Sequence, residues 1–139
     1  MEANELMIGD WVKISHLNKI GKVYRIDRAN GKGNGFAAVI DGDYYEGNLE
    51  PIPLTPEILE KNGFIANRHV YPYPYYELID KEHKLKIGFA FPQGNKTSYK
   101  NPWVYIDSER VFVEHLPCMF VHQLQHALRV CGIKKEIEL

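Results

Sequence analysis

The sequence predicts an α+β fold with an N-terminal small closed β-barrel, a short linker helix and a C-terminal antiparallel sheet packed on one long helix. Residues 6–53 alternate short apolar runs with tight turns, which is typical of a small barrel. Residues 54–64 carry signals for both ends of a helix, and residues 117–131 hold one apolar stripe at helical spacing. We therefore expect a barrel at 1–53, the linker helix at 54–64 and an α+β unit at 65–139, packed into one compact structural unit.

Composition limits the classes of function. Of the 139 residues, 45% are apolar and 25% are charged, as in a folded domain. The 17 Lys and Arg residues nearly balance 18 Asp and Glu residues, and the net charge of −1 excludes a histone-like or polybasic protein. No apolar run approaches the roughly 20 residues that a membrane helix needs.

We expect a cytoplasmic protein in the host cell, with virion association left open. The first five residues are acidic and lack the basic start and apolar core of a signal peptide. Cys118 and Cys131 fit this compartment as reduced, small, apolar side chains. Two cysteines this far apart build neither a disulfide framework nor a structural zinc site.

Turn residues divide the expected barrel into strands. Gly9 and Asp10 are expected to turn the chain between the apolar residues 6–8 and 11–14. Asp41 and Gly42 predict a two-residue hairpin, because both positions of such a turn need a positive φ. Closing these strands into a barrel would remove exposed sheet edges.

The linker helix has predicted boundaries at both ends. Thr55 is a good N-cap, and Pro56 suits the first helical position. Gly63 is placed to end the helix in the left-handed conformation, with Phe64 folding back on Leu59.

The C-terminal unit is expected to contain four strands, at about 68–79, 85–91, 103–106 and 110–115. The long helix should follow from Pro117 to Gly132, with a last short strand at 133–139. Its buried stripe is expected to comprise Phe120, Leu124, Ala127, Leu128 and Cys131.

The N-terminal region resembles a known class of barrels. The matching segments are IGDWVKI at residues 8–14 and GKVYRI at residues 21–26. They look like the opening of KOW/Tudor-type barrels of the Src-homology-three-like kind. The resemblance implies this barrel fold. It implies no particular ligand, because such barrels bind RNA, DNA, peptides or nothing known.

A second resemblance spans the chain. It rests on ANELMIGDWV at 3–12, PIPLTPEILEKNGF at 51–64 and VHQLQ at 121–125. Together they look like a group of small uncharacterised proteins of phages, prophages and mobile elements of gut anaerobes. The chain departs from that pattern after Gln125, where His126 stands. This resemblance implies an accessory protein and no particular activity.

A basic strip is one candidate binding site. Between residues 13 and 32 the cations exceed the anions by five, with Asp27 the single carboxylate. The strip comprises Lys13, Lys19, Lys22, Arg25, Arg28 and Lys32. Nearby Trp11, Tyr24 and Phe36 would stack on nucleic-acid bases if exposed, or fill the barrel core if buried.

A tyrosine cluster is a second candidate, for a protein interface or a small-ligand cleft. It comprises Tyr71, Tyr73, Tyr75 and Tyr76, interrupted by Pro72 and Pro74. The alternative is that alternate tyrosines pack under the long helix.

His122 and His126 have the i, i+4 spacing of two metal ligands on one helix face. A metalloprotease helix needs a glutamate beside the first histidine, and Gln123 stands there. We therefore expect a polar helix face on which one or both histidines bond the sheet or face solvent, and no metal, cofactor or catalytic group.

These observations predict a non-enzymatic accessory or interaction protein of phage or mobile-element origin, whose partner is another protein or a second copy of the chain. Two alternatives are a nucleic-acid-binding module that uses the basic strip and a binder of a small ligand. Such a ligand could be a nucleotide signal, as in a protein that counters host defence.

Overall fold

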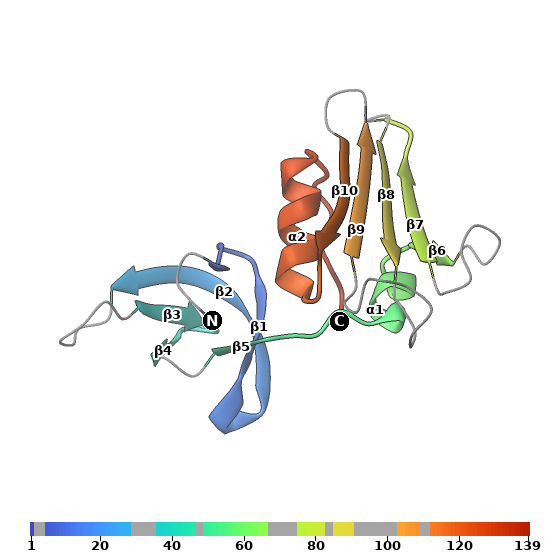
Figure 1. Cartoon of the computed structure of the whole chain (residues 1–139). Coiled ribbons are helices and arrows are strands. Elements are labelled where there is room, and N and C mark those ends of the chain that lie inside the picture. Colours follow the sequence, from blue (N-terminus) through green and yellow to red (C-terminus); the bar gives the residue numbers. More distant parts are fainter. Residues whose placement is uncertain are drawn as a thin grey trace. The chain divides into compact units, whose positions relative to one another are not determined.

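The computed structural model describes residues 1, 5–28, 36–46, 49–66, 75–82, 85–90, 103–108 and 112–139. Within these residues the chain forms two antiparallel five-stranded sheets and two α-helices (Figure 1). The expected α+β class is confirmed at this level. The chain divides into two compact units. Unit 1 is Met1–Pro53 with Phe120–His122, and unit 2 is Leu54–Met119 with Gln123–Leu139.

Unit 1 contains the first sheet, in the order β4-β3-β2-β1-β5. The strands are β1 (Trp11–Ile14), β2 (Lys19–Arg28), β3 (Phe36–Ile40), β4 (Asp43–Glu46) and β5 (Leu49–Pro51). A 3-10 turn at Ser15–Leu17 joins β1 to β2. Alternate residues of these strands fill one core, because successive side chains of a strand point to opposite faces. That core comprises Leu6, Val12, Ile14, Val23, Ala38, Ile40, Tyr45 and Leu49.

The long strand β2 connects the two halves of this sheet. Its first residues pair with β1 and its later residues pair with β3. Gly21 lies at the crossover, where a Cβ atom would come within 2.2 Å of the Ile40 side chain. A glycine at this position lets β2 pass close to the core.

The closed barrel expected for residues 1–53 is not confirmed. In the described residues, β4 pairs with β3 and β5 pairs with β1, and the sheet does not close between these two end strands. Local turn signals predict the strands, whereas closure depends on pairing between residues far apart in sequence. The predicted hairpin is confirmed: Asp41 has φ 51° and Gly42 has φ 87° between the paired residues Ile40 and Asp43.

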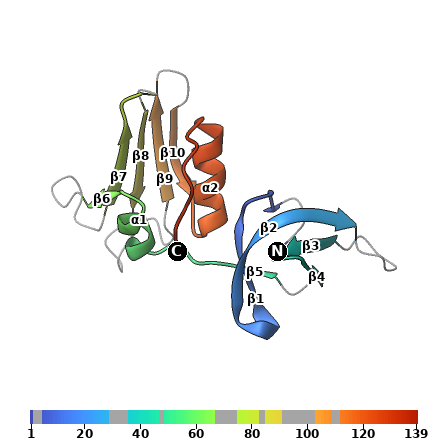
Figure 2. The ribbon, with the colours of Figure 1, turned by 180° about the vertical axis from the view of Figure 1, so that it is seen from behind.

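Unit 2 contains the second sheet, in the order β10-β9-β8-β7-β6 (Figure 2). The strands are β6 (Ile65–Ala66), β7 (Tyr75–Asp80), β8 (Leu85–Ala90), β9 (Trp103–Ser108) and β10 (Phe112–Pro117). The short β6 was not expected, and residues 67–74 of the predicted 68–79 strand lie outside the described residues. The core of unit 2 includes Ile87, Val104, Leu124 and Leu128, each at most 1% exposed.

The linker helix is confirmed as α1 (Pro56–Lys61). The Thr55 hydroxyl accepts a hydrogen bond from the Ile58 amide at 3.3 Å. Gly63 has φ 83°, and the Phe64 amide donates to the Leu59 carbonyl at 3.0 Å, as a Schellman ending requires.

The long helix is α2 (Val121–Val130), and it begins four residues later than the predicted Pro117. Pro117 instead ends β10, and Phe120 forms an isolated antiparallel bridge with Pro53. The Val121 amide donates to the Ile52 carbonyl at 2.9 Å. Tertiary pairing therefore holds these residues extended, although a proline is also compatible with a helix start.

Residues 133–139 do not form the predicted strand, and Asn62 holds this segment instead. Asn62 is 3% exposed. Its amide nitrogen donates to the carbonyls of Ile58 and Glu138, both at 2.7 Å. The Glu138 amide in turn donates to the Asn62 side-chain oxygen at 2.9 Å. The Asn62 side chain thus bonds the backbone of this segment in the way that a neighbouring strand would.

We predict that Asn62→Ala destabilises the protein by about 1–3 kcal/mol, because it leaves buried backbone groups without partners. Thermal melting monitored by circular dichroism measures this loss. Lys61→Ala is the control, since exposed Lys61 binds the Leu139 carbonyl and its removal should cost at most about 0.5 kcal/mol. Equal melting temperatures for the two variants would contradict the role of Asn62.

Candidate binding site

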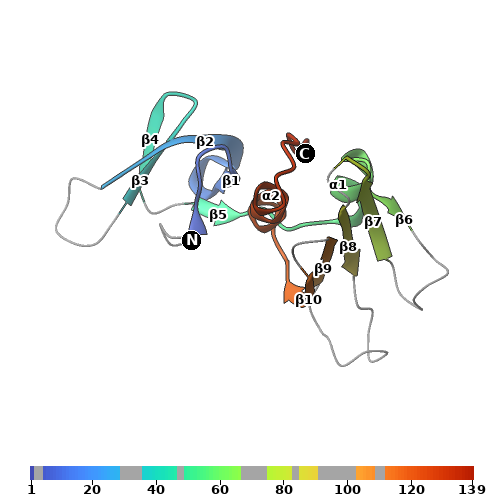
Figure 3. The same cartoon turned by 90° about the horizontal axis from the view of Figure 1, so that it is seen from above.

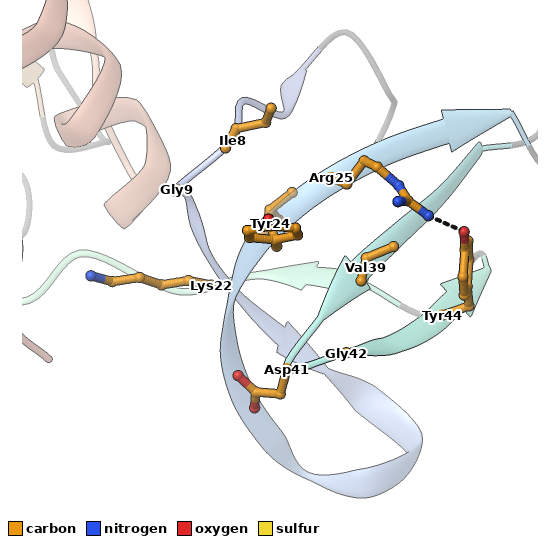
Figure 4. A pocket seen from close by; sticks show the side chains of 10 residues that line it. Ile8, Gly9, Lys22, Tyr24, Arg25, Val39, Asp41, Gly42 and Tyr44 are labelled. Carbon is orange, nitrogen blue, oxygen red and sulfur yellow. Dashed lines mark hydrogen bonds between the residues drawn. The ribbon is translucent and has the colours of Figure 1, made fainter.

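Unit 1 carries an open hollow with a volume of about 630 Å³. Figure 4 shows its lining side chains. These come from the turn before β1, from β2 and β3, and from the β3–β4 hairpin. The lining comprises Ile8, Gly9, Lys22, Val23, Tyr24, Arg25, Val39, Asp41, Gly42 and Tyr44.

A β-bulge in β2 aims two consecutive side chains at this hollow. Val23 lies opposite Ile40 and Arg25 lies opposite Val39, so that Tyr24 is the extra residue of β2. A bulge re-aims side chains that would otherwise alternate between the two faces of the sheet. Tyr24 and Arg25 consequently both line the hollow (Figure 4).

The hollow has an apolar floor and aromatic walls. Arg25, Val39 and Tyr44 form a row across three strands. Val39 is only 6% exposed, whereas the flanking Tyr24 and Tyr44 are 74% and 58% exposed. Such exposed rings around a buried valine offer a ready contact surface.

The turn before β1 forms another side of the hollow. The Asp10 amide donates to the Met7 carbonyl at 3.1 Å, and the Asp10 carboxylate accepts from the Met7 amide at 2.7 Å. Gly9, with φ 89°, makes the tight turn possible. The Val23 amide donates to the Asp10 carbonyl at 2.9 Å, which fixes the turn beside the bulge. The turn presents Ile8, which is 64% exposed.

Arg25 is held by an ion pair and by Tyr44. Its Nε donates to the Asp27 carboxylate at 2.8 Å, which raises the pKa of the guanidinium through hydrogen bonding and charge. Arg25 also donates to the Tyr44 hydroxyl, which donates to Asp27 at 3.1 Å. The guanidinium lies 5.6 Å from the Tyr44 ring centroid. These contacts hold the Tyr44 ring in place as a wall.

Other members of the basic strip are also paired. Lys19 bonds Asp41 at 2.9 Å, and this hydrogen bond raises the pKa of the lysine. The Lys22 ammonium lies 5.0 Å from the Trp11 ring centroid, a cation–π contact. Lys13 lies opposite Glu50 in the β1–β5 pair. Lys22 and Arg25 therefore line the hollow, and Lys19 and Arg25 pair with carboxylates.

The structure gives less detail for the last two members of the basic strip. Arg28 is the last residue of β2, and Lys32 lies outside the described residues.

The tyrosine cluster lies partly in the core of unit 2. Tyr71 and Tyr73 lie outside the described residues. Tyr75 and Tyr76 are 3% and 7% exposed. The Tyr75 ring covers Gly88 of β8, where a Cβ atom would come within 1.9 Å of the Tyr75 hydroxyl. These two side chains contribute packing rather than an open surface.

The structure buries His122, which does not lie on an exposed face of α2. His122 is 4% exposed and stacks on Phe120, with ring centroids 5.8 Å apart and an interplanar angle of 10°. His126 is half-buried. Gln125 is also buried, at 6% exposed. Within the described residues, no group of three or more metal-ligating His, Cys, Asp or Glu side chains occurs.

Comparison with protein-family models, curated proteins and solved structures finds no match to the chain. Neither helix of the described residues has the length and apolar character needed to cross a membrane.

Sequence reasoning found Tyr24, Lys22 and Arg25 but missed three other parts of the hollow. The missed residues are Ile8, Val39 and Tyr44. The Gly9-Asp10 pair signals a turn, yet nothing local indicates that this turn lies beside a bulge.

We predict that His122→Ala destabilises the protein by about 1–3 kcal/mol, because it removes a buried ring that stacks on Phe120. His126→Ala, at a half-buried position, should cost about 0.5 kcal/mol or less. Chemical denaturation measures both. If a chelator lowers the melting temperature of the wild type but not that of the double variant His122→Ala/His126→Ala, the two histidines instead hold a metal.

The two cysteines should differ in alkylation rate. Burial raises the pKa of the Cys118 thiol to about 12, and Cys118 is 1% exposed. Because the thiolate is the nucleophile, iodoacetamide at about pH 8 should modify the half-buried Cys131 first. Mass spectrometry of the native and unfolded protein measures the order. Equal native rates would contradict the burial of Cys118.

Proposed function

We propose that the chain is a non-enzymatic interaction protein whose unit 1 binds a segment of a partner polypeptide in the hollow. The supporting observation is the pair of exposed rings, Tyr24 and Tyr44, on either side of the buried Val39. Tyrosine offers a large contact area at low entropic cost, and it is enriched at the centres of interfaces. Exposed Ile8 adds apolar area at the rim.

The charges around the hollow favour a polypeptide over nucleic acid. Phosphate groups would have to compete with Asp27 for Arg25 and with Asp41 for Lys19. These pairs compensate the charges of Arg25 and Lys19, whereas counterion release by unneutralised cations drives nucleic-acid binding. A polypeptide needs no such competition, because its contacts are apolar and hydrogen-bonding.

Single-stranded nucleic acid is the second candidate. The observation in its favour is that Tyr24, Tyr44, Lys22 and Arg25 line one hollow. Base stacking on exposed rings beside cations is the usual mode of sequence-tolerant single-strand binding. A small nucleotide would stack on the same rings, and the titration described below tests it together with oligothymidine.

We further propose an Src-homology-three-like barrel architecture and a phage or mobile-element origin. The strand order β4-β3-β2-β1-β5 and the β2 strand shared by both halves support the architecture. The three sequence segments at 3–12, 51–64 and 121–125 support the origin.

A displayed library of linear peptides tests the proposed function. Peptides enriched on the full wild-type chain should bind Tyr24→Ser/Tyr44→Ser about tenfold more weakly or worse, since interface tyrosines contribute about 1–2 kcal/mol or more each. The matched control is Ile65→Ser/Ile79→Ser in unit 2, which removes apolar side chains that are 74% and 61% exposed. The control should bind as the wild type does.

Failure to enrich any peptide, or an equal loss in both double variants, would refute the proposal. Labelled oligothymidine and a free nucleotide, titrated at low and high salt, test the other candidates. Asp27→Asn/Asp41→Asn removes the partners of Arg25 and Lys19 and should raise oligothymidine affinity. Strong salt-dependent binding by the wild type itself would put nucleic acid first.

A further inference from the structure

Strand β4 is an edge of the first sheet. Within the described residues its pairing partner is β3, through Ala37–Glu46, Ala38–Tyr45, Val39–Tyr44 and Ile40–Asp43. Figure 3 shows β3 and β4 as a hairpin with β4 at the end of the sheet order. An edge strand carries a row of backbone donors and acceptors that a further strand would satisfy.

The turn geometry identifies which backbone groups point outward. Positive φ values at Asp41 and Gly42 define a two-residue turn, which places its hydrogen bond between Ile40 and Asp43. Hydrogen-bonded and non-hydrogen-bonded pairs alternate along an antiparallel ladder. Tyr45 therefore directs its amide and carbonyl toward β3, whereas Tyr44 and Glu46 direct theirs away from it.

The outward groups of Tyr44 lie beside the hollow. The same residue supplies the Tyr44 ring, whose hydroxyl is held by Arg25 and Asp27. A segment that adds to β4 would bond the Tyr44 backbone and place its own side chains against the fixed ring. Only an extended backbone supplies donors and acceptors at the spacing of this edge.

Charge selects the occupant of the edge. Strand β4 contains no Lys or Arg and two acidic residues, Asp43 and Glu46. A second copy that paired through β4 would bring Asp43 and Glu46 of both copies together, and like charges across a strand pair are destabilising. An extended segment rich in Lys or Arg complements this edge.

We propose that the β4 edge binds a basic, extended segment of a partner protein as an added strand. This inference rests on the proposed function, because it names how a polypeptide next to the hollow is held. Main-chain bonds to Tyr44 and Glu46 supply affinity, and the acidic edge and the Tyr44 ring supply selectivity.

The probes are two synthetic peptides of about ten residues, one alternating lysine with valine and one alternating glutamate with valine. Amide hydrogen exchange is read by NMR on the full chain. In the free protein the Tyr45 amide should be protected and the Tyr44 and Glu46 amides should exchange quickly. The lysine peptide should slow exchange at Tyr44 and Glu46 about tenfold or more, and the glutamate peptide should not.

A matched pair of variants isolates the backbone contribution. Glu46→Pro removes an outward amide, which an edge strand tolerates, and Glu46→Thr removes the same charge but keeps the amide. The proline variant should bind the lysine peptide about five- to tenfold more weakly than the threonine variant, as expected for one lost hydrogen bond. Equal affinities, or binding without protection at Tyr44, would overturn the edge inference.

The outcomes separate this inference from the proposed function. If library peptides bind through Tyr24 and Tyr44 while the lysine peptide leaves the Tyr44 amide unprotected, the hollow stands and the edge inference fails. Dimerisation of the free chain that Glu46→Pro abolishes would replace the partner segment with a second copy. Failure of every peptide to bind overturns both.

Discussion

The pairing of β2 with two neighbours at once is the constraint on which unit 1 depends. One half of β2 must match β1 and the other half must match β3, and the register shifts by one residue between Val23 and Arg25. The extra residue, Tyr24, cannot enter the core without displacing Val23 or Ile26. It is therefore directed outward beside Arg25, and the hollow follows from the bend in the sheet.

The same bend explains how the hollow acquires fixed walls. Just before the bulge, the Val23 amide donates to the Asp10 carbonyl and the Val23 carbonyl accepts from the Gly9 amide, so that Ile8 is presented next to Tyr24. On the opposite side, Asp27 orders both Arg25 and the Tyr44 hydroxyl. Each ion pair near the surface contributes little to stability on its own. Their effect here is to orient side chains and to reduce the positive field that the sequence alone suggests.

Features set by neighbouring residues could be predicted from the sequence. Asp41-Gly42 specifies its turn and Thr55 specifies a helix start, because the interactions that decide them span only a few residues. Pro117 failed as a helix start because the pairing of Phe120 with Pro53, distant in sequence, decides the backbone there. The burial of His122 and the extra residue at Tyr24 likewise depend on tertiary neighbours. In the hollow, the types of residue in the sequence indicated Lys22, Arg25 and the Tyr24 ring. The bulge that brings them together has no signal in the neighbouring sequence.

Tyr44 connects the two surfaces of unit 1 because its side chain and its backbone face different partners. The ring turns toward Arg25 over the sheet, where it forms a wall of the hollow. The backbone lies in a strand whose other side continues no further within the described residues. A flexible tyrosine would lose conformational entropy when a ligand fixed its ring and its backbone. The Tyr44 ring is already held by Arg25 and Asp27 before any ligand binds. Pre-ordering of this kind lowers the entropic cost of binding, so a short segment gains affinity at Tyr44 that it would not gain at an unsupported tyrosine.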